Sequence, residues 1–205
     1  MSKVIAFSGG CFSGKTTTTH IVKKELEDRG HKVVILGEII RNVTDKPIDI
    51  LRKDASAYLV LQDKIIREKM AMENEAFGDQ TDIIYLVDRA ITDSLFYLQN
   101  YVDKSSLSEN EMLKFCALHK DIVNHAKNAF VFGYDMLIEF IPIDGTNDDK
   151  FRPSIIDVSK EYEFEAIAVL NSAFVYNKLK YHRFNANTDD TRILIEKILC
   201  LDQMN

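Results

Sequence analysis

Residues 6–16 read Ala6-Phe7-Ser8-Gly9-Gly10-Cys11-Phe12-Ser13-Gly14-Lys15-Thr16. From Gly9 onward the spacing is one glycine, four residues and then Gly-Lys-Thr, which is the pattern of a phosphate-binding loop. The glycines that frame it allow backbone angles and close approaches that a side chain would prevent. The amides of such a loop, together with the start of the following helix, form a cradle for phosphate oxygens. We therefore predict that residues 9–17, ending at Thr17, bind the phosphates of a nucleotide.

Two side chains of this loop have separate predicted roles. Lys15 would reach the β- and γ-phosphates and support catalysis, and the Thr16 hydroxyl would bind Mg²⁺. The flanking sequence has the order that such a loop requires. An apolar run over residues 4–7 predicts a buried strand before it, and residues 17–29, closed by Gly30, predict a helix after it. This order favours a phosphate-binding loop over an ordinary glycine-rich turn.

The composition is typical of a globular domain. The chain has 205 residues, of which 46% are hydrophobic and 28% are charged. We predict a single domain over residues 1–205, because a chain of this length buries most of its apolar surface. The net charge of −6 argues against a general binder of nucleic acid or anionic membranes.

The three cysteines, Cys11, Cys116 and Cys200, are widely spaced and odd in number, as is typical of a reducing compartment. No apolar run approaches the length of a membrane span, and the first residues predict a strand rather than a signal sequence. We therefore expect a cytoplasmic protein. Cys11 lies inside the predicted loop and is interpreted either as a redox-sensitive thiol or as a tolerated small side chain.

A second apolar run predicts a parallel sheet. Residues 32–36 form a short β-branched run, and the alternation of strands with helices favours an α/β fold with helices on both faces of the sheet. Ligands of such sheets bind at the carboxyl ends of the strands. This placement brings Glu38 and Arg41 near the phosphate loop, where they would contact an acceptor substrate. A solvated carboxylate with an unrelated arginine is the alternative.

A long helix comes next. Asp54 is typical of an N-cap, and apolar residues at helical spacing extend to about residue 77. Gln62 lies close to the apolar stripe, where it either faces a substrate pocket or lies on a solvated flank.

The stretch over residues 82–89 is the second informative one. An apolar strand ends at Asp88, an acid that would orient Mg²⁺ or its water shell beside Thr16. Arg89 would project into the cleft, where a guanidinium suits recognition of phosphate or ribose. Asp93 opens the next helix, either as a partner of the helix dipole or as an acceptor of hydrogen bonds from substrate hydroxyls.

The next region contains a helix and a strand. Ser108 and Glu111 have the spacing of a capping box, and Cys116 is expected on the core face of the helix that they open. His119 and His125 are expected at the surface, because they lack the spacing of metal ligands. Residues 135–141 predict a fourth strand.

The polar loop at 144–153 contains Arg152 and is expected to act as a lid over bound phosphates, spanning about residues 143–158. Arg152 would then stabilise charge on the transferred group, unless the loop is simply solvated. A helix over 159–176, a short fifth strand at 181–184 and a final helix capped by Asp189 and Asp190 complete the chain.

These motifs occur together in one order. They are the phosphate loop, Glu38-x-x-Arg41, Asp88-Arg89 followed by Asp93-Ser94, and an arginine after the fourth strand. In this order the chain resembles the nucleoside and nucleotide kinase branch of phosphate-loop enzymes over residues 4–201. It is most similar to the nicotinamide-riboside kinase domains of bacterial NAD-synthesis regulators and their AAA-like relatives. The stretch at 88–94 is also similar to the Asp-Arg motif of thymidylate kinases.

The resemblance implies a three-layer fold with a five-stranded parallel sheet and the phosphate loop after a central first strand. It implies ATP and Mg²⁺ at Lys15 and Thr16, and a carboxylate, Glu38 or Asp88, that activates the acceptor hydroxyl. It also implies acceptor contacts from Arg41 and Arg89, and a lid that carries Arg152. The partner would be a nucleoside or nucleotide, and a homodimer stays open as the oligomeric state.

We therefore expect an ATP-dependent kinase that phosphorylates a small acceptor. A regulatory nucleotide-binding NTPase is one alternative, although residues 177–180, Asn-Lys-Leu-Lys, lack the final acid of a guanine-reading motif. A polynucleotide 5′-kinase is another, and the acidic net charge counts against it.

Overall fold

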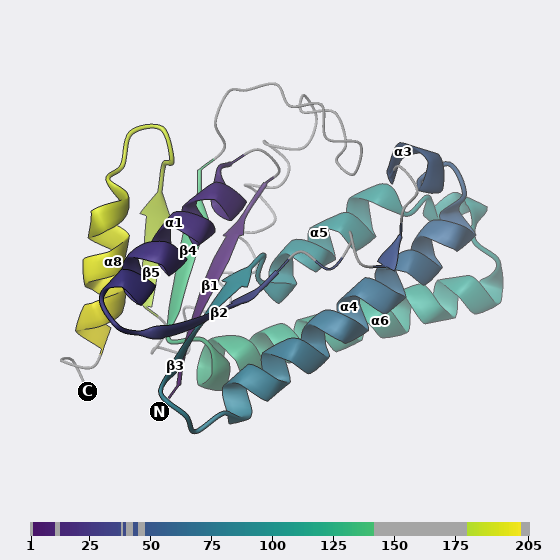
Figure 1. Ribbon diagram of the computed structural model, residues 1–205. Helices are drawn as coiled ribbons and strands as arrows, with labels where there is room; N and C mark the ends of the chain where they lie inside the picture. The colour runs from purple at the N-terminus through teal and green to yellow at the C-terminus, as the bar shows by residue number, and fades with distance from the viewer. Residues whose placement is uncertain are drawn as a thin grey trace.

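The computed structural model describes residues 2–10, 13–37, 39, 43–44, 48–141 and 180–201. Its centre is a five-stranded parallel sheet in the order β2-β3-β1-β4-β5 (Figure 1). The strands are β1 Lys3–Gly9, β2 Lys32–Leu36, β3 Ile83–Asp88, β4 Met136–Phe140 and β5 Lys180–Phe184. The predicted five-stranded parallel sheet with a central first strand is thus confirmed.

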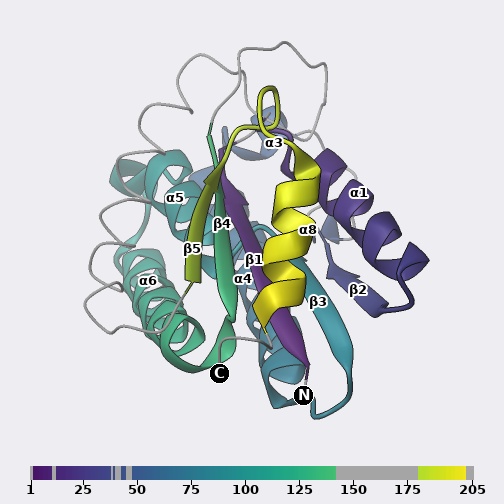
Figure 2. The ribbon, with the colours of Figure 1, turned by 90° about the vertical axis from the view of Figure 1, so that its left-hand side faces the viewer.

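Helices cover both faces of the sheet. They are α1 Lys15–Asp28, α3 Ile48–Leu51, α4 Ala55–Gly78, α5 Ile91–Tyr101, α6 Glu109–Asn128 and α8 Thr191–Leu199. Two short segments add a 3₁₀ turn, η1 Lys104–Ser106, and a π turn, η2 Ala129–Gly133. Helices α1 and α8 lie on one face and α4, α5 and α6 on the other, so that the described residues form three layers (Figure 2).

The central strand is apolar because both of its faces are buried. Ile5 and Phe7 pack on the side of α1 and α8, whereas Val4 and Ala6 pack on the side of α4, α5 and α6. The register pairs Phe7 of β1 with Asp88 of β3. The carboxyl ends of these two strands therefore lie level with each other, directly beside the start of the phosphate loop.

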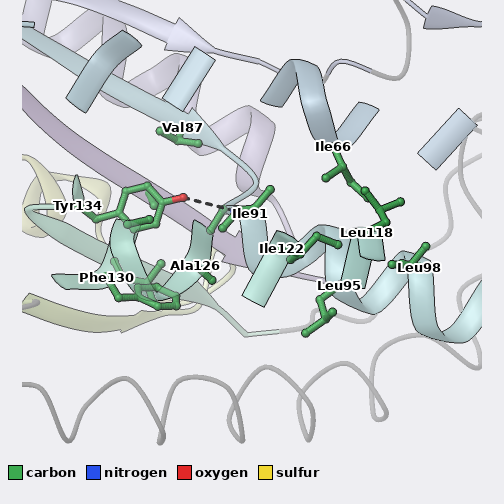
Figure 3. Close-up of a cluster of buried hydrophobic side chains, with 14 of the residues drawn as sticks. Ile66, Val87, Ile91, Leu95, Leu98, Leu118, Ile122, Ala126, Phe130 and Tyr134 are labelled. Carbon is green, nitrogen blue, oxygen red and sulfur yellow. Dashed lines mark hydrogen bonds between the residues drawn. The ribbon is translucent and has the colours of Figure 1, made fainter. Parts of the chain in front are cut away.

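Two hydrophobic clusters hold the layers together. The cluster under α1 and α8 includes Val22 and Leu26 of α1 and Leu194 of α8. The larger cluster fills the space between the sheet and α4, α5 and α6 (Figure 3). Its side chains include Ile66, Ile91, Leu118 and Ile122, as well as the aromatic ring of Tyr134, whose hydroxyl points toward the start of α5.

The predicted helix starts are confirmed where the structure describes them. The Asp54 side chain accepts a hydrogen bond from the Ala57 amide at the start of α4, and Asp190 accepts one from the Arg192 amide at the start of α8. Ser108 and Glu111 form the predicted capping box at the start of α6. Each cap satisfies an amide that has no partner within its helix.

Two sequence expectations about burial, those for Cys116 and His125, are wrong, and one of the two alternatives for Gln62 is excluded. Cys116 is exposed on α6, because Phe115, Leu118 and Ile122 form the buried stripe of that helix. Gln62 is buried on α4, which excludes the solvated flank and leaves the alternative of a substrate pocket as a prediction. His125 lies against a buried carboxylate, and its side chain is only 9% exposed.

Other expectations lie outside the described residues, namely the lid at 143–158 and the helix at 159–176. Within the described part of the chain, none of the helices has both the length and the apolar character needed to cross a membrane.

Candidate active site

The phosphate loop begins where β1 ends, and its backbone conformation explains why Gly9 and Gly14 are glycines. Gly9 has φ of 144°, and an added Cβ would lie 2.7 Å from the Phe140 carbonyl oxygen of the adjacent strand. Gly14 has φ of 82° and is the N-cap of α1, and a Cβ there would lie 2.6 Å from the Cβ of Ala186. Both positions therefore require glycine, for backbone angle and for space.

Lys15 is buried inside its own loop. Its ammonium donates hydrogen bonds to the carbonyl oxygens of Gly9 and Gly10, each at 2.6 Å, and to the Ser13 hydroxyl at 3.1 Å. The Ser13 hydroxyl also donates to the Gly10 carbonyl at 2.9 Å. These contacts hold a positive charge at the start of α1, where the helix dipole also favours an anion.

A second polar contact joins this loop to the end of β3. The Thr16 hydroxyl donates to Asp88 Oδ2 at 2.8 Å, although 72 residues separate the two in the sequence. Asp88 is 3% exposed, and its Oδ1 atom has no hydrogen-bond partner among the described residues. A buried carboxylate oxygen beside a hydroxyl is an oxygen donor set that suits Mg²⁺, which takes its remaining ligands from water and phosphate. The residues present therefore fit this metal.

The turn after β3 is unusual in its backbone. Arg89 has φ of 80°, and it is the only non-glycine residue with a positive φ in the described part of the chain. Its amide and that of Ala90 both donate to the Phe7 carbonyl at 3.0 Å. Its guanidinium donates to the Tyr97 hydroxyl at 2.6 Å and lies 5.3 Å from the centre of that ring. Strained residues of this kind cluster at functional sites, where the surrounding structure holds them in place.

Asp93 connects α5 to the central strand. Its Oδ1 atom accepts a hydrogen bond from the Ser8 hydroxyl at 2.6 Å, and the Asp93 side chain is buried at the first turn of the helix. Because Ser8 directly precedes Gly9, Asp93 lies beside the entrance to the phosphate loop. Its position at the start of α5 agrees with both sequence interpretations of this acid.

The structure does not describe every predicted site residue. It brings together the loop residues Gly9, Gly10, Ser13, Gly14, Lys15 and Thr16 with Asp88 and Asp93, and it places Arg89 at the same edge of the sheet. Thr17 is exposed on the first turn of α1, and Gln62 is buried on α4. The remaining predicted residues, Cys11, Phe12, Glu38, Arg41 and Arg152, lie outside the described residues.

Sequence reasoning missed a carboxylate on β4. Glu139 pairs in register with Ser8 and is 4% exposed. Its carboxylate receives a hydrogen bond from the Tyr181 hydroxyl and lies 3.1 Å from the Arg183 guanidinium, both on β5. The only signal in the sequence is an acid inside the apolar run of a strand, which burial makes costly unless the acid is paired.

The arrangement combines four chemical elements at one edge of the sheet. They are an anion cradle, a buried ammonium, a hydroxyl with a carboxylate for a divalent cation, and the pair of Arg89 and Asp93 on the turn from β3 into α5. Together they suit a substrate that carries phosphate groups, with Mg²⁺ as the counter-ion.

The comparisons with known proteins agree with this arrangement. The model of a family described as an AAA domain matches residues 4–148. A search of the curated proteins finds no match. Among solved structures, a NadR protein in complex with NR has a TM-score of 0.59 at 14% sequence identity, and the alignment covers 98% of this chain. A NadR protein in complex with NAD and AMP-PNP has a TM-score of 0.56 at 12% identity, with 97% of this chain covered.

A third structure matches along nearly its whole length. The deoxyadenosine kinase from M. mycoides with bound dATP has a TM-score of 0.55 at 15% identity, and the alignment covers 96% of this chain and 97% of that one. By contrast, the chain spans only about half of the two NadR chains, 51% and 49%. At these identities the likeness shows the fold alone, which this chain shares with the two NadR structures and with the deoxyadenosine kinase. The similarity to the thymidylate-kinase Asp-Arg motif stays a prediction.

Proposed function

Since the chain belongs to the AAA domain family, we propose that it is an ATP-dependent kinase that transfers the γ-phosphoryl group to a nucleoside or nucleotide. The single observation that carries this proposal is the hydrogen bond of 2.8 Å between Thr16 and Asp88. It joins the phosphate loop to the end of β3, and both residue types at these two positions are suited to hold the metal of a bound nucleotide.

The proposed mechanism relies on positioning and charge. Lys15 would exchange its contacts with the Gly9 and Gly10 carbonyls for phosphate oxygens, and the loop amides would bind the same phosphates. Thr16 and Asp88 are the residues that would hold Mg²⁺, which would neutralise negative charge on the phosphates. Glu38 or Asp88 would accept the proton of the acceptor hydroxyl. Arg152 would stabilise the transferred group.

The acceptor would lie beside the start of α5. Arg89 would bind its phosphate or ribose, and Asp93 would accept hydrogen bonds from its hydroxyls, with Arg41 and Gln62 as further contacts. Solved structures of similar fold support an acceptor of this class, since one is a deoxyadenosine kinase and another binds NR. The proposal includes a lid over residues 143–158, a single domain over residues 1–205 and a cytoplasmic location.

The direct test supplies ATP and Mg²⁺ with a panel of nucleosides and nucleotides, including deoxyadenosine and nicotinamide riboside, and measures ADP release. We expect Lys15→Ala and Asp88→Asn to lower kcat/KM by about 100-fold or more, because each removes a charge aimed at the phosphates or their metal. Lys24→Ala and Asp28→Asn are matched controls, since both side chains are exposed on α1. Full activity in Lys15→Ala or Asp88→Asn would exclude the proposed roles.

The same panel separates the alternative functions. Phosphate incorporation into an oligonucleotide but not into nucleosides would indicate a polynucleotide 5′-kinase. Slow hydrolysis without any acceptor, together with tighter binding of GTP than of ATP by calorimetry, would indicate a regulatory NTPase.

A further inference from the structure

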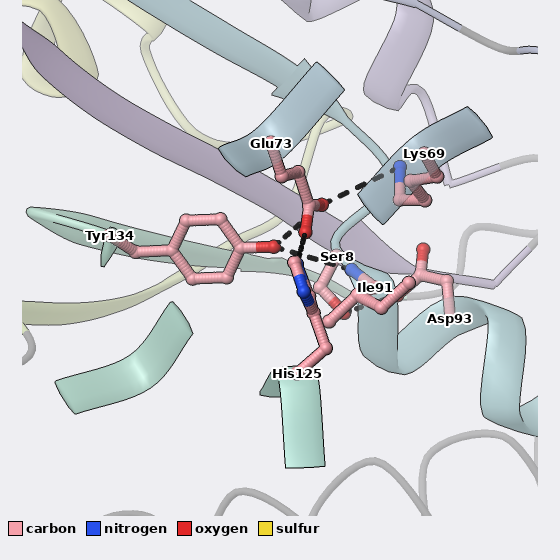
Figure 4. Close-up of polar contacts among 7 residues, drawn as sticks. All are labelled: Ser8, Lys69, Glu73, Ile91, Asp93, His125 and Tyr134. Atoms are coloured by element: carbon pink, nitrogen blue, oxygen red, sulfur yellow. Dashed lines mark hydrogen bonds and ion pairs between the residues drawn. The ribbon is translucent and has the colours of Figure 1, made fainter. Parts of the chain in front are cut away.

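A buried polar cluster lies between α4, α6 and the segment before β4, outside the residues assigned above. It consists of Lys69, Glu73, His125 and Tyr134, and we call it the Glu73 cluster (Figure 4). Glu73 is fully buried at 0% exposure, beside the larger hydrophobic cluster between the sheet and α4, α5 and α6. A buried carboxylate destabilises the fold unless it is paired. The partners of Glu73 therefore indicate its structural role.

The three partners of Glu73 in this cluster are all close to it. The Tyr134 hydroxyl donates to Glu73 Oε1 at 2.7 Å. His125 Nε2 lies 2.7 Å from Oε2, and the Lys69 ammonium lies 3.9 Å from Oε1. Because both carboxylate oxygens are engaged, the carboxylate is fixed in one orientation. That orientation in turn fixes the direction of the Tyr134 hydroxyl.

The Tyr134 hydroxyl has a second contact, which is with the first residue of α5. The amide of Ile91, the first residue of α5, lies 3.3 Å from the Tyr134 oxygen and points toward it (Figure 4). The first amides of a helix lack partners within the helix, and the N-cap residue here, Ala90, has no side chain that could accept. Tyr134 therefore caps α5 from a distant part of the chain.

The protonation of Tyr134 suits this arrangement. Burial, together with the neighbouring charge of Glu73, raises the pKa of Tyr134 well above its ordinary value. The hydroxyl thus keeps its proton across the physiological range, donates to Glu73 and offers its oxygen lone pairs to the Ile91 amide.

The helix start that Tyr134 caps is the one that carries the acceptor residues. Arg89 and Ala90 are tied to β1 through the Phe7 carbonyl, and Asp93 is tied to β1 through Ser8. Tyr134 supplies a further anchor, through the Glu73 cluster. The turn from β3 into α5 is therefore held both by the central strand and by the helical layer, which preserves the strained backbone of Arg89.

We propose that Tyr134, oriented by Glu73, is a positioning residue that fixes the first turn of α5 and thereby sets the places of Arg89 and Asp93 for acceptor binding. This inference rests on the proposed kinase function. A residue that only fills the core would contribute through its ring, which the Tyr134→Phe variant retains, and not through the hydroxyl that the variant removes.

The test combines amide hydrogen exchange with kinetics on the full chain. In Tyr134→Phe we expect the exchange rate of the Ile91 amide to rise about fivefold, the change that corresponds to a lost hydrogen bond of about 1 kcal/mol. We expect KM for the best nucleoside acceptor of the panel to rise about fivefold or more, with KM for ATP unchanged. Tyr85→Phe is the matched control, because Tyr85 also donates to an aspartate, Asp79, but away from the start of α5.

A second pair of variants tests the role of Glu73. Glu73→Gln keeps an oxygen that accepts from Tyr134, and we expect it to preserve the slow exchange of Ile91. Glu73→Leu removes that acceptor, and we expect it to reproduce the effect of Tyr134→Phe. Unchanged exchange at Ile91 in Tyr134→Phe, or equal rises of both KM values, would overturn the positioning role. Absence of phosphoryl transfer by the wild-type chain would instead overturn the proposed function, and the exchange measurement would still decide whether Tyr134 holds α5.

Discussion

Arg89 combines a strained backbone with a proposed role in acceptor binding. It has φ of 80°, a region that L-residues with a Cβ enter at a cost, and yet it carries a side chain that reaches the Tyr97 hydroxyl. A glycine would adopt the same angle without that cost. The backbone is therefore strained at the residue whose guanidinium we propose binds the acceptor.

This strain predicts a difference in the free energy of unfolding between two variants that truncate the Arg89 side chain. Arg89→Ala and Arg89→Gly both remove the guanidinium, but only alanine keeps the cost of the left-handed backbone. We expect Arg89→Gly to be more stable than Arg89→Ala by about 1 kcal/mol, measured by urea unfolding, while both lose acceptor affinity to the same extent. Equal stability of the two variants would mean that the turn relaxes away from positive φ.

At the scale of elements, the helix starts use several devices, and α4 and α8 share one of them, an aspartate N-cap. Helix α1 has Gly14 as its N-cap and no side-chain cap, α5 is capped by the distant Tyr134, and α6 has its own capping box. The capping box is local in sequence, so Ser108 and Glu111 predicted it directly. The cap of α5 depends on how the segment around Tyr134, between η2 and β4, packs against the start of α5, and no sequence pattern near Ile91 predicts it.

Because of the capping box of α6, the free energy of unfolding is expected to change with pH in the acidic range. Hydrogen bonds from the Ser108 side chain, then from Ser56 and the Ser108 amide, lower the pKa of Glu111 from 4.5 to about 2. A carboxyl with a lowered pKa in the folded state stabilises the fold above its ordinary pKa, and this contribution is lost as pH falls toward 2.

We therefore expect Glu111→Gln to unfold at lower urea than the wild-type chain at neutral pH, with a difference that shrinks as pH falls from 4.5 toward 2. Urea midpoints across this range measure the effect. Glu109→Gln is the control, because Glu109 lies in the same first turn outside the capping box. A difference that stays constant with pH would show that the charge of Glu111 does not contribute.

At the scale of the whole molecule, the sequence predicts the local elements and the contacts that parallel topology imposes. The strand, loop and helix around Gly9 and Gly14 are encoded in consecutive residues. Thr16 and Asp88 lie close together because parallel strands end at the same edge of the sheet. The topology of the sheet was also implied by the resemblance to phosphate-loop kinases.

The contacts that the sequence did not predict depend on how helices pack on the sheet. The sequence left Gln62 open between a pocket and a solvated flank of α4, and it did not single out Glu73. Both are buried, because α5 and α6 cover that face of the helix. His125 was expected at the surface, and the same packing buries it. Polar residues can be identified from a single sequence. Which of them are buried depends on how the helices pack, and a single sequence does not show this.

Nucleotide binding should be visible as a change in the stability of the whole chain. A ligand that binds only the folded state stabilises it by about 2.7 kcal/mol at 100 times its Kd, which for a chain of this length is a rise in Tm of about 5–10 °C. We expect AMP-PNP with Mg²⁺ to raise Tm in this way, because its phosphates would fill the cradle formed by the loop and the start of α1. Lys15→Ala should lose most of the rise, and Lys24→Ala, exposed on the same helix, should keep it. The same rise in Lys15→Ala and in the wild-type chain would show that the nucleotide binds elsewhere than the phosphate loop. The proposed role of Thr16 and Asp88 as the residues that hold the metal of the nucleotide would then be excluded.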